Sequence, residues 1–236
     1  MPEALRPFVK TIWTLDAGGD GAENLTNEAL PDGCIEVIRR LNGSSSWHRS
    51  QPAVFAAGIC SKPAVLELSG DASFIGVRLW PWAWNQISDC PATLFHDDWI
   101  ALDDNSAVAR LVSNPAGPLT SVLQVFSPYL PDSIGKHVPS VSTTGELALA
   151  SGKGHRTIQR WFGKEIGHPP RKYFKLLRFQ NAIAEPDKDG GSLAMEAATL
   201  GYADQSHMAR NFKEFAGSTT RQVRKSAQGP FLADKR

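Results

Sequence analysis

A group of side chains with amide, hydroxyl and guanidinium groups lies near the end of this 236-residue sequence. They fall on one side of a segment whose apolar residues, Met208, Phe212 and Phe215, recur at helical spacing. The residues on the other side are Gln205, Ser206, Ala209, Arg210 and Lys213. Guanidinium and amide groups can form paired hydrogen bonds with the edges of DNA bases. The spacing therefore predicts a helix whose exposed face carries base-reading groups.

The segment before this helix predicts a second, shorter helix and a tight turn. Asp204 stands where a helix N-cap is expected, and Gly217 where the helix should stop. Gly201 suits the reversal between the helices, because glycine tolerates a positive φ angle. The shorter helix has an apolar stripe formed by Leu193, Met195, Ala198 and Leu200. Together these features predict a DNA-binding helix-turn-helix over residues 192–223.

The same order of elements occurs earlier in the sequence. A short apolar helix is expected over residues 147–150, Gly152 breaks it, and a second helix follows over residues 156–166. The inward side of this second helix consists of Ile158, Phe162 and Ile166. Its outward residues include Arg156, Gln159 and Arg160. A long amphipathic helix over residues 170–184 should connect the two units.

Residues 145–225 resemble the DNA-binding domain of the arabinose-regulator (AraC/XylS) family of bacterial transcription factors. The segments that carry the resemblance are GYADQSH and RNFKEFAG in the second unit and SGKGHRTIQRWFGKEIG in the first. The first unit departs from the family pattern at Lys153 and at Gly154, where a serine-like cap is usual. The resemblance implies a sequence-specific transcription regulator whose partners are double-stranded DNA and RNA polymerase.

The resemblance also implies roles for individual side chains. The base-reading positions match Arg156, Gln159 and Arg160 in the first unit and Gln205, Ser206 and Arg210 in the second. Ala209 could contact a thymine methyl group. Thr157, Lys213 and the cations of the connecting helix would hold phosphates, which position the protein without specifying sequence. The alternative for each is an exposed helix residue that does not contact DNA.

Charge divides the chain into two parts, although the net charge is only +1. Residues 141–236 contain 16 Lys and Arg against 9 Asp and Glu, a net charge of +7, and the remainder is at −6. This distribution fits a DNA-binding domain over residues 132–236 and a different domain over residues 1–131. A solvated charge gradient without function is the alternative.

Short strands separated by turn residues dominate the first half of the sequence. The expected strands cover residues 8–15, 34–41, 54–60, 64–68 and 74–80. Helical segments are expected over residues 81–88, 107–112 and 119–129. The predicted fold class is α+β: an amino-terminal antiparallel β-barrel or sandwich with a few helices, and an all-α carboxy-terminal domain with two helix-turn-helix units.

The amino-terminal strands also resemble a cupin-like sensor domain of the same regulators, which implies control by a small-molecule effector. Trp80, Trp82 and Trp84, with Trp99 nearby, could line an apolar or aromatic ligand pocket. The alternative is that these indoles pack the barrel against its helices.

Other residues whose side chains could bind a ligand or a metal fit structural roles better. Arg78, in an apolar strand, should form a salt bridge rather than bind an anionic ligand. The adjacent side chains of His96, Asp97 and Asp98 cannot converge on one ion, so a solvated turn is expected. The cysteines Cys34, Cys60 and Cys90 have no paired short spacing and are expected to be free thiols.

An enzyme with a catalytic barrel and a DNA-targeting domain is the main alternative to a regulator. Cupin-like barrels usually work through a metal held by several histidines, but His48, His96 and His137 share no strand-like spacing. We therefore expect no enzyme activity, no cofactor and no metal.

No apolar run reaches the length of a signal peptide core or a membrane span, which favours a cytoplasmic protein without membrane contact. Residues 119–129 are a candidate helix for homodimerisation.

Overall fold

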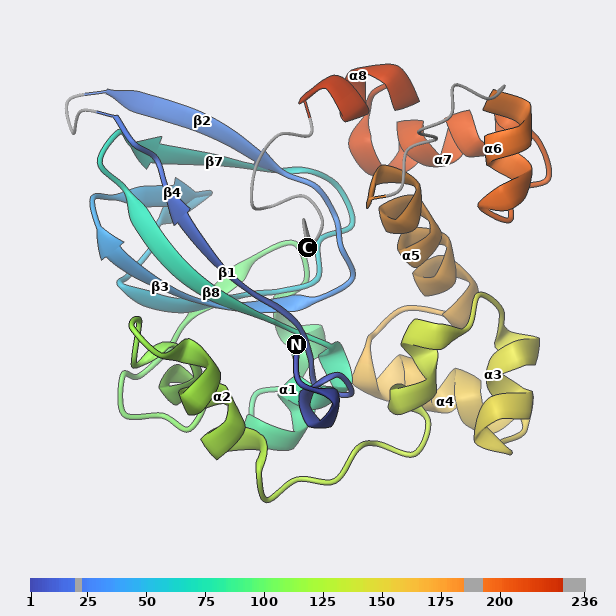
Figure 1. Cartoon of the computed structure of the whole chain (residues 1–236), viewed down its shortest axis with the longest axis horizontal. Helices are drawn as coiled ribbons and strands as arrows, with labels where there is room; N and C mark the ends of the chain where they lie inside the picture. The colour runs from blue at the N-terminus through green and yellow to red at the C-terminus, as the bar shows by residue number, and fades with distance from the viewer. Residues whose placement is uncertain (20–22, 185–192, 227–236) are drawn as a thin grey trace.

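The computed structural model describes residues 1–19, 23–184 and 193–226 (Figure 1). Residue 192, with which the predicted second helix-turn-helix begins, and the last ten residues of the predicted DNA-binding domain, 227–236, lie outside the described residues. Two sheets lie on one side of the molecule and a set of helices on the other (Figure 1). This arrangement confirms the predicted α+β class.

The amino-terminal domain contains two antiparallel sheets. The first has the order β1 (Val9–Asp16), β8 (Ser73–Leu79), β3 (Ile35–Asn42), β6 (Val54–Ala57) and β9 (Trp99–Ala101). The second has the order β2 (Asn24–Ala29), β7 (Ala64–Ser69), β4 (Ser45–Trp47) and β5 (Arg49–Ser50). The sheets face each other without closing into one barrel (Figure 1). All five predicted strands are present, whereas β2, β4, β5 and β9 were missed because they are short or largely polar.

The five-stranded sheet is buried on both faces. On β3, Ile35 and Val37 pack toward the helices, whereas Ile38 packs between the sheets. On β8, Val77 and Phe74 divide between the two faces in the same way. Because side chains alternate along a strand, Glu36 and Arg78 project toward the space between the sheets. The strand register places these two residues directly opposite each other.

Short helices cover the outer face of this sheet. The α-helices are α1 (Pro81–Ile87) and α2 (Pro118–Phe126). The 3-10 helices are η1 (Glu3–Leu5), η2 (Ala92–Phe95), η3 (Ala109–Val112) and η4 (Gly135–Ser140). The predicted helix over residues 107–112 is thus a 3-10 turn. No helix in the described ranges is long and apolar enough to cross a membrane.

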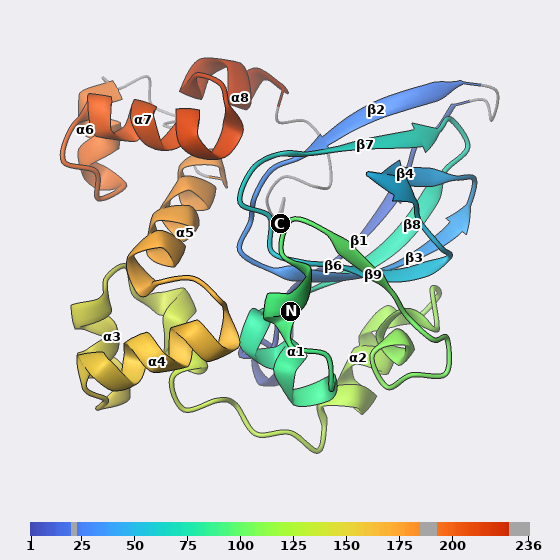
Figure 2. The same ribbon diagram turned by 180° about the vertical axis from the view of Figure 1, so that it is seen from behind.

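The carboxy-terminal helices form two helix-turn-helix units joined by a long helix. The first unit contains α3 (Thr144–Ser151) and α4 (His155–Glu165), and the second α6 (Leu193–Thr199) and α7 (Gln205–Ala216). The connecting helix α5 (Pro170–Ala184) runs from one unit to the other beside the amino-terminal domain (Figures 1 and 2). A last helix, α8 (Thr220–Ser226), was not predicted.

The predicted apolar stripe of α6 was wrong for Met195 and Ala198, whereas Leu200 packs against the core as predicted. Met195 and Ala198 are exposed, whereas Glu196 and Ala197 are buried. The reason is an ion pair between Glu196 and Arg224 of α8, which compensates the buried carboxylate. An ion pair with a helix 28 residues away in sequence cannot be read from the local apolar pattern.

Candidate functional site: two reading helices and a cavity between the sheets

Helix α7 presents the predicted reading residues of the second unit. Asp204 caps it, because its Oδ1 accepts a hydrogen bond of 2.6 Å from the backbone N–H of His207. Met208, Phe212 and Phe215 are buried, as predicted from the helical spacing. The residues on the opposite face are all exposed: Gln205, Ser206, Ala209, Arg210 and Lys213.

Helix α4 of the first unit likewise has one buried apolar side and one exposed polar side. Ile158, Phe162 and, just after the helix, Ile166 are buried. Its N-cap, Gly154, makes no side-chain bond, which agrees with the departure from the family pattern. Arg156, Gln159 and Arg160 are exposed, and Thr157 is half-buried. Within the described part of the chain, the polar side chains on both reading faces form no hydrogen bond or ion pair with another residue.

A groove of about 680 Å³ lies between the two units. It is lined by α5 cations together with the start of α3, where Thr143 Oγ1 accepts a 3.1 Å hydrogen bond from the N–H of Glu146. Lys175 is paired with Glu214 of α7, and Arg178 lies over the ring of Tyr202. Arg171 and Lys172 form no ion pair within the described residues. These two cations are therefore the ones that α5 leaves available to an anionic ligand.

Helix α8 holds the second unit in place. Arg224 pairs with Glu196 of α6, and its Nη2 donates a 2.8 Å hydrogen bond to the carbonyl of Ala182 at the end of α5. One guanidinium thus links three helices. The sequence analysis missed this role, although an Arg in a polar segment next to a helix-turn-helix could have suggested it.

Comparison with known families assigns both parts of the chain. Residues 147–226 match a family described as a helix-turn-helix domain. The carboxy-terminal helices are an AraC-type helix-turn-helix DNA-binding domain. The chain is therefore a DNA-binding transcription regulator. Residues 2–101 match a second family, described as a domain of unknown function (DUF6597).

Solved structures of ToxT from Vibrio cholerae are similar to the whole chain. One is 12% identical with a TM-score of 0.47, covering 94% of this chain and 99% of that one. Another, of ToxT bound to an unsaturated fatty acid, is 11% identical with a TM-score of 0.46, covering 97% and 98%. At these values the likeness assigns no ligand to this chain. No curated protein matches it.

The three predicted ligand tryptophans lie in the core. Each indole N–H donates to a backbone carbonyl: Trp80 to Arg6, Trp82 to Pro7 and Trp84 to Cys90. Trp82 also packs against Trp161 of the DNA-binding domain, with ring centroids 5.7 Å apart. These contacts are those of the packing role, and none of the three residues lines the cavity between the sheets. That they bind a ligand stays a prediction.

The turn before β3 connects the amino-terminal domain to α5. Tyr173 Oη donates a 2.8 Å hydrogen bond to the carbonyl of Gly33, and Gln180 donates to the carbonyl of Pro31. Gly33 has a φ of +75°, a conformation that favours glycine. A Cβ at this position would also lie only 3.1 Å from the Tyr173 ring, so there is little room for a side chain. The helix that joins the two reading units is thus held by one turn of the other domain.

The loop of His96, Asp97 and Asp98 is structural, and its side chains diverge. Asp97 accepts hydrogen bonds from Ser61, and Asp98 pairs with Arg49. His96 packs on His168, between α4 and α5, with ring centroids 4.7 Å apart. The three side chains therefore have separate partners. All three residues are half-buried, so the predicted solvated turn is only partly exposed, and His96 lies at the contact with the DNA-binding domain.

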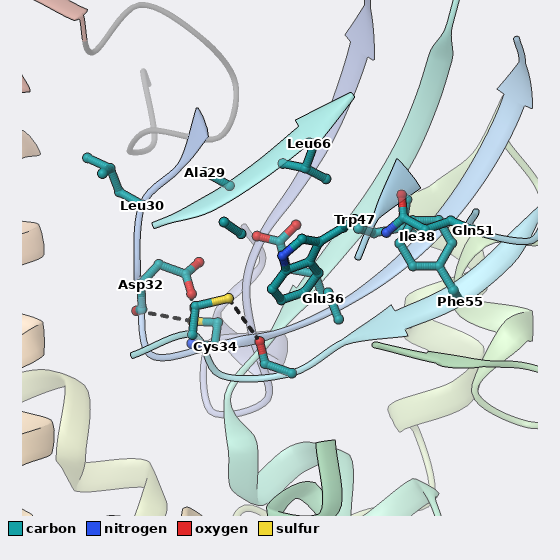
Figure 3. A pocket seen from close by; sticks show the side chains of 14 residues that line it. Ala29, Leu30, Asp32, Cys34, Glu36, Ile38, Trp47, Gln51, Phe55 and Leu66 are labelled. Atoms are coloured by element: carbon teal, nitrogen blue, oxygen red, sulfur yellow. Dashed lines mark hydrogen bonds between the residues drawn. The ribbon is translucent and has the colours of Figure 1, made fainter. Parts of the chain in front are cut away.

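A cavity of about 50 Å³ lies between the two sheets (Figure 3). Its polar side chains are Asp32, Glu36 and Gln51, and its apolar wall includes Trp47 and Phe55. Cys34 and Cys60 also line it, and burial raises the pKa of both thiols well above the usual range, which favours their protonated form.

Arg78 lies behind the two carboxylates and is itself only 2% exposed. Its Nε is 2.7 Å from Asp32 Oδ2, and its Nη2 is 2.6 Å from Glu36 Oε1. The predicted salt bridge of Arg78 is therefore confirmed, and both Asp32 and Glu36 are its partners. Burial raises the pKa of the Glu36 carboxyl above its ordinary value, and the Arg78 guanidinium offsets only part of this effect.

Proposed function

We propose that this regulator places α4 and α7 in successive major grooves on one face of DNA, about 34 Å apart. Arg156, Gln159 and Arg160 would read one half of the site. Gln205, Ser206 and Arg210 would read the other half, with Ala209 against a thymine methyl group. The observation that carries the proposal is that both helices expose polar side chains without protein partners on the face opposite their buried side.

Phosphate contacts would come from residues beside the reading faces. Thr157 and Lys213 flank the base-reading positions of their helices. Arg171 and Lys172 line the groove between the units, together with the start of α3. Because the DNA backbone crosses between two successive major grooves, this groove suits the phosphates between the half-sites.

We further propose that residues 1–131 form a sensor domain and residues 132–236 the DNA-binding domain. Support comes from the turn at Pro31 and Gly33, which holds the helix that sets the distance between the two reading units. A small molecule bound to the amino-terminal domain could change DNA affinity only by binding the two states of this contact unequally.

The remaining features follow from this role. The protein would act in the cytoplasm, without enzyme activity, metal or cofactor, and would contact RNA polymerase on DNA. Helix α2 exposes Leu119 and Leu123 and is the element we propose for a homodimer contact.

Selection of duplexes from a random DNA pool by the full chain tests the central proposal. We expect a motif with two conserved blocks separated by one helical turn. The Arg210→Ala variant should lose preference at a position in one block only. The exposed Arg110, far from the reading helices in sequence, provides the matched control: Arg110→Ala should select the wild-type motif. Equal enrichment of all sequences by the wild-type chain would refute the proposal.

A further inference from the structure

The cavity between the sheets contains a buried polar group without a partner. Gln51 is only 4% exposed. Neither Oε1 nor Nε2 of its amide forms a hydrogen bond within the described residues. Such a group is unfavourable, because it has given up its bonds to water and gained none in return. The amide lines the cavity, so a bound molecule could both donate to its oxygen and accept from its nitrogen.

The other polar groups of the cavity are two carboxyl groups that contact the same cation. Asp32 and Glu36 share the single guanidinium of Arg78. Two carboxyl groups thus lie next to one guanidinium, and a second cation beside them would favour the ionised form of Glu36, whose pKa is raised by burial. Among the charged neighbours of Glu36, Lys10 has the smallest effect on the pKa of its carboxyl. The Lys10 ammonium lies 5.6 Å from the centre of the Trp80 ring. The site is therefore suited to a cationic group, which would complete the charge balance.

Size and shape limit the molecule further. A cavity needs about 10–15 Å³ to hold one water molecule, so a cavity of about 50 Å³ has room for about four groups of the size of a water. Asp32 and Gln51 lie toward opposite ends of the drawn site, and Trp47 lies between them (Figure 3). The Trp47 indole offers both apolar contact and a favourable face for a cation.

We propose that this cavity binds a short primary amine that also carries a hydroxyl group. Its ammonium would lie at Asp32 and Glu36, and its hydroxyl would donate to and accept from the amide of Gln51. This inference rests on the proposed sensor function and names the chemical class of its effector.

The site has a direct structural connection to the DNA-binding domain. Asp32 belongs to the turn whose Pro31 and Gly33 carbonyls accept hydrogen bonds from Gln180 and Tyr173 of α5. The Oδ1 atom of Asp32 also accepts a 2.9 Å hydrogen bond from the N–H of Cys34, which fixes the shape of this turn. A cation that attracts the Asp32 carboxylate therefore acts on the same few residues that hold α5.

Calorimetric titration of the full chain with probes of four non-hydrogen atoms tests the proposal. The probes are 2-aminoethanol, propan-1-amine, which lacks the hydroxyl, and ethane-1,2-diol, which lacks the ammonium. We expect 2-aminoethanol to bind at least tenfold more tightly than either of the others. Equal affinities, or tightest binding of the diol, would overturn the proposal.

Two variants locate the binding. Gln51→Met replaces the amide with an apolar side chain of similar length, so it should weaken 2-aminoethanol at least tenfold and remove its advantage over propan-1-amine. Gln124→Met makes the same change at an exposed position on α2 and should leave all three affinities unchanged. If Gln51→Met, folded by circular dichroism, binds 2-aminoethanol like the wild type, the assigned site is wrong.

Measuring operator affinity with and without 2-aminoethanol tests the ligand class and the proposed regulator function separately. Saturating 2-aminoethanol should shift the affinity of the full chain for its selected operator at least threefold, in either direction. Operator binding without any heat of 2-aminoethanol binding would overturn the ligand class and leave the regulator intact. Absence of sequence-specific DNA binding, with the amine bound, would instead overturn the proposed function.

Discussion

At the scale of single residues, we expect base contacts and phosphate contacts to come from different side chains of the reading faces. Arg160 and Gln205 lie on different helices, and both are exposed and free of protein partners among the described residues. We expect Arg160→Ala and Gln205→Ala each to relax base preference in opposite halves of the site, by about 1–3 kcal/mol. Lys213→Ala should weaken binding to all sequences alike. Competition binding with single-base operator variants measures both effects, and a sequence-dependent effect of Lys213→Ala would place it among the base readers.

We expect the histidine pair His96 and His168, between the domains, to make the stability depend on pH. Burial, with help from Lys172 and His96, lowers the pKa of His168 to about 4, whereas Asp97 acts weakly in the opposite direction. The unfolded chain, with a histidine pKa of about 6.5, then binds more protons than the folded one between these values. The free energy of unfolding should therefore fall as pH falls from about 6.5 toward 4.

Urea unfolding at pH 7 and pH 5 measures this effect. We expect His168 to account for a loss on the order of 1 kcal/mol, less than the full shift implies, because the half-exposed ring is screened by solvent. His168→Phe keeps the ring contact with His96 and should reduce the pH dependence. The exposed His155 serves as a control, since His155→Phe should behave like the wild type. An unchanged pH dependence in His168→Phe would contradict the assignment.

At the scale of secondary-structure elements, the cap of α7 decides how firmly the second reading helix is formed. Asp204→Ala removes the acceptor for the His207 N–H and should destabilise the protein by about 0.5–2 kcal/mol. Asp204→Asn keeps an oxygen in the same place and should recover most of that loss. Thermal unfolding measures the stability of both variants, and equal melting temperatures for Asp204→Ala and Asp204→Asn would show that the cap contributes little.

The reading helices α4 and α7 belong to units that are held in different ways. The second reading unit depends on Arg224, which joins α8, α6 and the end of α5 through one side chain. The first unit shares its core with the amino-terminal domain: Ile158 and Phe162 belong to the same apolar cluster as Ile35 and Val77. The two reading helices are therefore packed in different apolar clusters of the molecule.

At the scale of the whole molecule, the contact between the turn before β3 and α5 links the two domains. Tyr173→Phe removes the donor to the buried Gly33 carbonyl and should lower the free energy of unfolding by about 1–3 kcal/mol. Tyr129→Phe removes a hydroxyl that has no hydrogen-bond partner among the described residues and should have little effect. Chemical unfolding of the full chain measures both, and similar losses in the two variants would argue against the interface bond.

Local features were readable from the amino-acid order alone. The helices α4, α5 and α7 follow from apolar residues at helical spacing with caps and glycine stops, because these signals act within a few residues. The five predicted strands follow from alternating and apolar runs between turns. Exposure of Arg156, Gln159, Gln205 and Arg210 follows from the same periodicity, since a residue opposite the buried side of a helix faces solvent.

Features that join distant parts of the chain were decided only by tertiary structure. Tyr173 and Gly33 are 140 residues apart, and their hydrogen bond has no local signal. The buried Glu196 depends on Arg224, and the packing of Trp82 depends on Trp161. The cavity of Asp32, Glu36 and Gln51 exists because two sheets face each other and the register puts Glu36 opposite Arg78. Burial and charge compensation depend on which elements meet in space, and for that reason residue order alone could not reveal them.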